Sequence, residues 1–214
     1  MEYHAGNRHL KAREQILVMR PERLRVEASS PFGVALIVAV DGSRLQIYDP
    51  GKNVLMHGAA TADGLERFAQ IPMEPKAAVD LLMAIAPDSE DLASRGEATI
   101  DQGGAIVINY PAADGGHREA RFAGDNLVGM RESDGAGQIR YEVRYADYHD
   151  IGALMFPYSI DADFPAAGSS LKLTFKRPIV NAPLAPAMFT LTPGPTTKEI
   201  DLDHPPPTPA TPRS

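Results

Sequence analysis

The chain of 214 residues contains no cysteine. Disulfide bonds, cysteine metal ligands and thiol nucleophiles are therefore excluded. This absence does not identify a compartment, because proteins of the reducing cytosol and disulfide-free proteins of the periplasm can both lack cysteine. Positive charge is also scarce: 21 Lys and Arg residues stand against 28 Asp and Glu, a formal net charge of −7. Phosphate binding needs a basic face, so we expect no nucleic-acid partner.

Long apolar runs and catalytic motifs are missing too. No apolar run reaches the ~18 residues that a membrane-spanning helix needs, and Met1-Glu2-Tyr3-His4 does not open a signal peptide. There is no Gly-x-Ser-x-Gly elbow, no His-Glu-x-x-His helix and no phosphate-binding glycine loop. The six histidines are scattered without metal-ligand spacing. We therefore expect a protein that is not an enzyme and needs no cofactor or metal.

Apolar residues alternating with polar ones are abundant. Hydrophobic residues form 43% of the chain, enough for a full core in one domain. Period-two alternation recurs between turn signals such as Asp41-Gly42 and Gly124-Asp125. It predicts strands at residues 8–19, 22–29, 33–40, 43–49, 53–58, 96–101, 104–110, 117–123, 126–133, 138–147, 154–162 and 170–177, and the intervening patterns predict helices at 62–70 and 75–85. So many strands imply a mainly β fold, with one large curved antiparallel sheet or a barrel.

The stretch 16–50 is the most informative part of the chain. It reads as four short strands joined by turns, with a Ser30-Pro31-Phe32-Gly33 corner in the middle. Turns normally carry small or polar residues, so an exposed Phe32 would need an apolar partner, such as a membrane or an acylated ligand. The alternative is that Phe32 folds back and plugs one end of the sheet. Arg23 and Arg25 share one strand face, which is either solvated or part of a binding site.

Further short motifs follow this stretch in a fixed order, over roughly residues 15–202. In chain order the motifs are Arg20-Pro21, Arg23–Val26, Ser30–Gly33, Asp41-Gly42, Tyr48–Pro50, Pro72–Pro75, Leu81-Leu82, Phe156-Pro157 and Val180–Leu184, the last preceding a short strand that ends at Phe189. Their order and spacing resemble the Lol lipoprotein-localisation proteins of the Gram-negative envelope, LolB more closely than LolA.

The resemblance implies an incomplete half-barrel of about eleven strands, closed by a helical lid. Its cavity would bind and transfer acyl chains of lipoproteins or other lipids without performing a reaction. Further partners would be a periplasmic carrier protein and the inner surface of the outer membrane, with the protein located there or in the periplasm. Pro31, Phe32 and Gly33 would form the loop that contacts membrane or cargo, and Arg23 and Arg25 would be polar residues at the mouth or lid.

The resemblance also predicts domain limits. LolB-like proteins begin with a lipid-bearing cysteine, a helix and a first strand, so we expect this chain to lack its N-terminal helix and most of that strand. The half-barrel domain would cover residues 1–203. Residues 204–214 form a proline-rich tail that cannot pack, and we expect it to be disordered.

The inward strand faces and the lid supply the predicted cavity lining. These residues are Leu24, Val26, Leu36, Val38, Ile47, Leu82, Ile85, Ile108, Leu127, Tyr141, Val143, Met155, Leu171 and Leu173. Each could instead fill a solid core, and a one-residue shift in register would turn the other face inward. Two other functions therefore stay open: a periplasmic binder or sensor of another lipid or glycolipid on the same fold, and a structural scaffold with a filled core.

Overall fold

The computed structural model describes residues 1–6, 8–69, 71–112 and 114–204. The predicted disordered tail lies outside the described residues, apart from His204. Two compact units are formed, the first by Met1–Glu14 and Lys76–Leu184, the second by Gln15–Pro75 and the described residues from Ala185 onward. The prediction of one domain over residues 1–203 stays a prediction. The predicted mainly β, antiparallel fold with few helices is confirmed.

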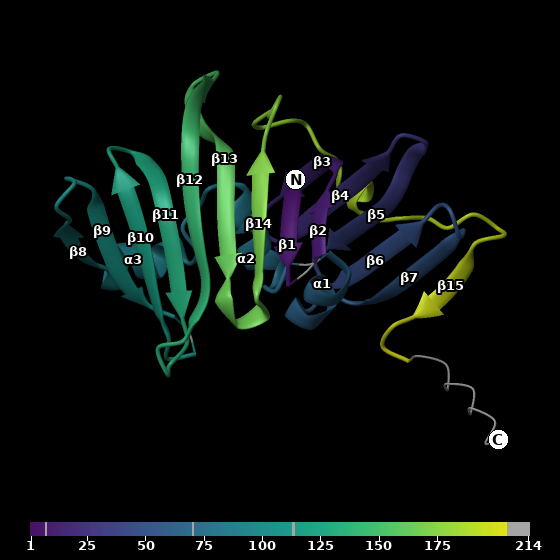
Figure 1. Cartoon of the computed structure of the whole chain (residues 1–214), viewed down its shortest axis with the longest axis horizontal. Coiled ribbons are helices and arrows are strands. Elements are labelled where there is room, and N and C mark those ends of the chain that lie inside the picture. Colours follow the sequence, from purple (N-terminus) through teal and green to yellow (C-terminus); the bar gives the residue numbers. More distant parts are fainter. Residues whose placement is uncertain (7, 70, 113, 205–214) are drawn as a thin grey trace. The chain divides into compact units, whose positions relative to one another are not determined.

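The first unit contains a nine-stranded sheet of order β2-β1-β14-β13-β12-β11-β10-β9-β8 (Figure 1). Every pair of neighbours in it is antiparallel. Its strands are β1 (Glu2–Ala5), β2 (Arg8–Lys11), β8 (Glu97–Ile100), β9 (Ile106–Pro111), β10 (His117–Ala123), β11 (Asn126–Ser133), β12 (Ile139–Ile151), β13 (Leu154–Phe164) and β14 (Ser169–Thr174). The short 3-10 helix η1 (Pro165–Ala167) joins β13 to β14.

Alternation along the strands separates a buried face from a charged one. Tyr141, Val143 and Tyr145 of β12 are buried, whereas Glu142 and Arg144 between them point to the other face. There Arg144 pairs with Asp163 at 2.8 Å. The alternation predicted for residues 138–147 therefore holds, and the buried face is the one that the helices cover.

Two helices lie over that face, α2 (Pro75–Leu82) and α3 (Ser89–Arg95). We call α2, α3 and the loop between them the cover. Helix α3 begins within the acidic run Asp88–Asp91. Acidic side chains in a first turn favour helix formation through the helix dipole, and Asp91 pairs with Arg95 one turn later at 3.5 Å.

The second unit contains a six-stranded sheet of order β15-β7-β6-β5-β4-β3. Its strands are β3 (Arg13–Met19), β4 (Arg23–Ser30), β5 (Gly33–Asp41), β6 (Arg44–Asp49), β7 (Val54–Ala59) and β15 (Lys198–Asp201). The last strand, β15, pairs with β7 in parallel, unlike the rest of the fold. Helix α1 (Ala62–Ala69) contacts β6 and buries Leu65 completely.

Two sheets are present where one sheet of about eleven strands was expected. The difference arises within predicted strand 8–19, which is two strands, β2 and β3, separated by Ala12. The first belongs to the nine-stranded sheet and the second to the six-stranded sheet. The period-two pattern gives no sign of this change of partner, because it records which face is buried and not which strand lies alongside.

The C-terminal segment crosses one face of the six-stranded sheet, and we call residues 186–197 the strap. The prediction of a short strand that ends at Phe189 is wrong, because Pro186–Phe189 form the 3-10 helix η2. Proline at its start cannot donate to a ladder. The side chain of Gln46, 4% exposed, exchanges two hydrogen bonds with the backbone of Leu191, at 2.9 and 2.8 Å. Phe189 is completely buried.

Candidate functional site

A cavity of about 350 Å³ lies between the cover and one end of the nine-stranded sheet. Its walls come from the cover, from the β10–β11 turn and from the neighbouring strands β12 and β13. The lining residues are Met83, Ala84, Ile85, Ala86, Ser89, Leu92, Phe122, Asp125, Asn126, Leu127, Tyr148 and Met155. Most of these side chains are apolar, and the few polar ones suit a ligand with a long apolar part and a small polar end.

Local sequence explains why the cavity remains open at this point. Helix α2 ends at Leu82, and Ala84 has a left-handed φ of 53°, so the chain turns away from the sheet. Pro87 follows, and a helix cannot continue through the residue before a proline without strain. The small side chains of Ala84 and Ala86 then face Phe122 and Leu127 across the gap and leave the space unfilled.

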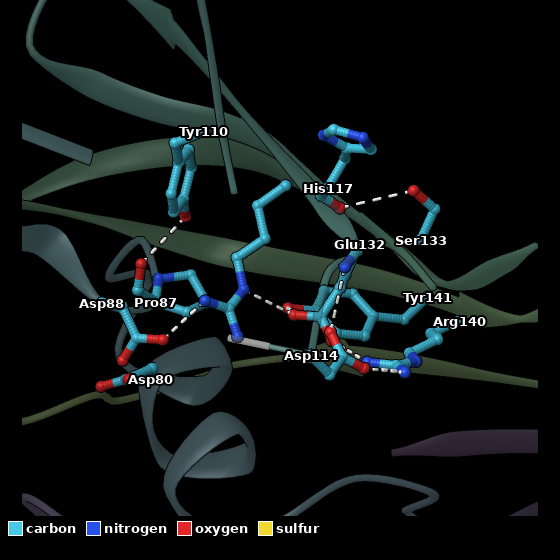
Figure 2. Close-up of polar contacts among 12 residues, drawn as sticks. Asp80, Pro87, Asp88, Tyr110, Asp114, His117, Glu132, Ser133, Arg140 and Tyr141 are labelled. Carbon is cyan, nitrogen blue, oxygen red and sulfur yellow. Dashed lines mark hydrogen bonds and ion pairs between the residues drawn. The ribbon is translucent and has the colours of Figure 1, made fainter. Parts of the chain in front are cut away.

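Tyrosine hydroxyls hold the cover to the sheet. Tyr145 on β12 donates a hydrogen bond to the Leu81 carbonyl of α2 at 3.0 Å. Tyr110 on β9 donates to the Pro87 carbonyl at 2.9 Å, as Figure 2 shows. Both tyrosines are buried, so each bond also gives a buried hydroxyl the partner that it needs.

A network of charged residues ties the cover to the sheet at Asp88, between the cavity-lining residues Ala86 and Ser89. Arg118 on β10 donates to Glu132 on β11 at 2.6 Å and to Asp88 of the cover at 2.5 Å. Lys76 of α2 donates to Asp88 at 2.9 Å and to Asp80 at 3.1 Å.

The network continues across the sheet, and Figure 2 shows this part of it. Glu132 also accepts hydrogen bonds from Arg140 at 3.1 Å and from the Tyr141 hydroxyl at 3.2 Å. Arg140 in turn pairs with Asp114. We call the set Lys76, Asp80, Asp88, Asp114, Arg118, Glu132 and Arg140 the charge network.

The electrostatics of this region favour the ionised form of Asp88 and the neutral form of the tyrosines. The hydrogen bond from Lys76, helped by the charge of Arg118, holds the pKa of Asp88 below its ordinary value. Burial raises the pKa values of Tyr110, Tyr141 and Tyr145 far above their ordinary values, so these hydroxyls stay protonated and keep donating. The arrangement suits mechanical attachment of the cover.

The structure places only part of the predicted lining at the cavity. Ile85, Leu127 and Met155 line it. Elsewhere in the first unit, the predicted residues that pack as core or against the cover are Leu82, Ile108, Tyr141, Val143, Leu171 and Leu173. In the second unit, those that lie buried or half-buried in the six-stranded sheet are Leu24, Val26, Leu36, Val38 and Ile47. Leu82 and Val143 are buried and are not among the residues that line this cavity, so their predicted place in a lining stays a prediction.

The Ser30–Gly33 corner is the tip of the β4–β5 hairpin, and its exposure agrees with the sequence reading. Phe32 is 100% exposed, so the alternative of a core plug is wrong. Ser30 shapes the tip: its Oγ accepts from the Phe32 N–H at 3.2 Å and donates to the Gly33 carbonyl at 3.1 Å. Gly33 has a φ of 121°, which a side chain would strain. Contact of this corner, Pro31 included, with membrane or cargo stays a prediction.

The arginine pair on β4 has a structural partner. Arg25 donates to the Met188 carbonyl of the strap at 2.8 Å and pairs with Glu27. Arg23 is half-buried on the same strand. A role of the pair at a mouth or lid stays a prediction.

Sequence reasoning missed the charge network, although a signal was available. Arg118 stands on the same strand face as Ala120 and Phe122, and Glu132 shares a face with Met130. A charge at an inward position of an apolar face predicts a buried polar contact, because an unpaired buried charge is costly. The inward position of Phe122 could also have been predicted, because it shares a strand face with Ala120. The positions of Met83, Ala84 and Ala86 at the cavity could not, because they depend on where the cover turns.

Comparison with known proteins rests on structure. No family model and no curated protein match this sequence. A LolA superfamily protein from Nitrosomonas europaea superposes with a TM-score of 0.56 over 89% of this chain and 86% of its own, at 11% identity. A DUF1329 family protein from Desulfovibrio piger gives 0.56 over 88% and 86%, at 8% identity.

The chain has a LolA-like fold. At such identities the likeness concerns the fold alone, and it does not favour LolB over LolA. A third structure, a domain named for outer-membrane lipoprotein sorting from Vibrio parahaemolyticus, has a TM-score of 0.49 at 11% identity over 81% of this chain and 80% of its own, and we draw nothing from it. No helix in the described part of the chain is long and apolar enough to cross a membrane.

Proposed function

We propose that this protein binds an apolar chain of a lipid in the cavity between the cover and the nine-stranded sheet, and carries it without chemical change. The acyl chain of a lipoprotein in the Gram-negative envelope is the ligand we favour, and a periplasmic location goes with it. The observation that carries the proposal is the cavity itself. It is partly open to solvent, and its methionine, alanine, leucine and phenylalanine side chains leave apolar surface uncovered, which a purely structural scaffold has no need to expose.

The size of the cavity limits the ligand. At about 350 Å³ it lies near the lower end of the ~300–1,000 Å³ that ligand pockets occupy. One apolar chain, or part of one, fits such a space. A larger lipid would need the cover to move, and the charge network resists that movement because it holds Asp88, which lies between the lining residues Ala86 and Ser89.

Filling the cavity tests the proposal. Ala86→Trp should weaken binding of a fluorescent fatty acid at least about tenfold, or 1.4 kcal/mol, because the indole takes the ligand's place. The melting temperature should change little, since the side chain enters empty space. Measurement is by fluorescence titration and thermal melting of the same samples. Lipid extraction and native mass spectrometry of protein from a bacterial envelope would identify the natural ligand.

Ala93→Trp is the matched control, because Ala93 lies exposed on α3 and does not line the cavity. It should bind the fatty acid like the original chain. If Ala86→Trp and Ala93→Trp bind the fatty acid with equal affinity, the ligand does not occupy this cavity. The interpretation as a structural scaffold would then be favoured.

The exposed corner of the second unit gives a separate prediction. Phe32→Glu should leave the free energy of unfolding within about 0.5 kcal/mol, because the side chain is fully exposed. If the corner contacts lipid, the same change should abolish liposome co-sedimentation, since a charge resists entry into hydrocarbon. Phe32→Leu keeps an apolar tip and should retain binding. Undiminished co-sedimentation of Phe32→Glu would rule out the membrane role of this corner.

A further inference from the structure

Strands β12 and β13 continue beyond their neighbours. Strand β11 pairs with β12 only as far as Arg144, and β14 pairs with β13 only from Ser159. Within the described chain, the strand residues of Tyr148–Pro157 therefore pair only with one another, from Tyr148↔Pro157 to Ile151↔Leu154. We call Tyr148–Pro157 the projecting hairpin. Figure 1 shows the β12–β13 turn rising beyond the ends of β11 and β14.

Side-chain contacts hold the projecting hairpin in place at its base. The Tyr148 hydroxyl donates to the Leu127 carbonyl of β11. The His149 ring meets the edge of Tyr158 at 4.5 Å between centroids, and Phe156 packs on Phe175 at 5.6 Å. An isolated two-stranded hairpin is marginally stable in water. These contacts make it an ordered projection of the sheet.

The tip of this ordered projection is apolar. Ile151–Pro157 contain no charged residue, and Leu154 and Met155 are 47% and 45% exposed. A hairpin turn normally carries polar residues, so adjacent exposed apolar side chains indicate an apolar partner. The nearest charges lie on β12, where Asp147 pairs with His149 at 2.9 Å and the exposed Asp150 lies opposite Met155 in the strand register.

The tip and the cavity share a residue. Met155 is half exposed and also lines the cavity, and Tyr148 at the base of the hairpin lines it too. A ligand chain leaving the cavity along this wall passes over Met155 directly onto the apolar tip. Methionine suits such a path, because its flexible side chain adapts to differently shaped apolar partners.

We propose that the projecting hairpin dips its tip into the surface of an electrically neutral lipid bilayer, and that the ligand chain moves between bilayer and cavity along Met155. This proposal rests on the proposed function and adds the route by which the cavity is loaded. The surface is neutral because Asp147 and Asp150, near the tip, would be repelled by anionic headgroups. The site is distinct from the Phe32 corner, which belongs to the other unit.

The chain has no tryptophan, so Leu154→Trp introduces a single fluorescent reporter at the tip. With phosphatidylcholine vesicles that carry brominated acyl chains, its emission should shift to the blue and be quenched. Ile179→Trp is the matched control, because Ile179 is 79% exposed but lies outside the hairpin, and its emission should not change. Unchanged emission of Leu154→Trp on adding vesicles would overturn the proposal. A blue shift that follows protein concentration without vesicles would overturn it too, in favour of self-association.

Leu154→Glu separates this proposal from the proposed function. Leu154 does not line the cavity, so the affinity for a fluorescent fatty acid in solution should be unchanged. Vesicle flotation should fall at least about tenfold, because a carboxylate at the tip opposes entry into hydrocarbon. If Leu154→Glu floats with vesicles normally and binds the fatty acid normally, the hairpin proposal is rejected and the cavity function stands. If the unsubstituted chain does not bind the fatty acid, the cavity function itself is rejected.

Discussion

Replacing Arg118 with methionine should lower the free energy of unfolding by about 3 kcal/mol, because it removes one partner from a largely buried ion pair. The Glu132 side chain is only 10% exposed and would lose its 2.6 Å partner, and Asp88 would lose its tie to the sheet. At about 2–4 °C per kcal/mol for a chain of this size, the melting temperature should fall by roughly 6–12 °C. Backbone amides of α2 and α3 should exchange hydrogen faster, because the cover is less firmly held.

Two further variants show whether the loss comes from the charge network. Arg144→Met removes an arginine of the opposite sheet face that is 61% exposed, and such surface pairs contribute about 0–1 kcal/mol. The double change Arg118→Met with Glu132→Leu should regain part of the lost stability, because it removes the largely buried carboxylate that has lost its Arg118 partner and keeps only Arg140 and Tyr141. If Arg118→Met melts like Arg144→Met, the network does not hold the cover.

Phe189→Ala should destabilise the second unit by about 3–5 kcal/mol, the usual cost of truncating a fully buried phenylalanine. Phe189 is 0% exposed and is the one residue of η2 that is buried, so its ring fastens the strap to the sheet. Without the ring, the hydrogen bonds from Gln46 and Arg25 to the strap should open more often. Limited proteolysis should then cut within residues 186–197 while strands β4–β7 remain folded longer.

Phe32→Ala provides the matched control for this truncation. It removes the same side chain from the same unit, but from a position that is fully exposed, so its effect should stay within about 0.5 kcal/mol. Equal melting temperatures of Phe189→Ala and Phe32→Ala would show that the strap contributes no stability through its aromatic anchor.

Sequence patterns predicted most strands because burial of one sheet face imposes period-two alternation. Residues 138–147 are the clearest case, and their apolar positions are buried as expected. The turn at Phe32 was also predictable, because proline and glycine flank the phenylalanine, whereas the sequence left open whether the ring is exposed or buried. Local residue chemistry was sufficient for both.

The cavity and the charge network could not be derived in the same way, because each depends on residues far apart in the chain. Arg118 meets Asp88 and Glu132 only after the sheet is paired and the cover has folded over it. Which apolar residues face empty space depends on the turn at Ala84, whose left-handed backbone no pattern of hydrophobicity records. Most of the predicted lining therefore turned out to be packed core.

Each unit is built from separate segments of the chain, and this affects the order in which the units fold during synthesis. Strands β3–β7 are synthesised early, yet β15, which pairs with β7, and Phe189 arrive only after the whole central part of the first unit. Contacts so distant in sequence form slowly. Until then, the sheet surface around Ala39 and Gln46 that the strap later covers is open to solvent, and such exposed surfaces promote aggregation during folding. Synthesis of Phe189 and β15 is thus the step that completes the second unit.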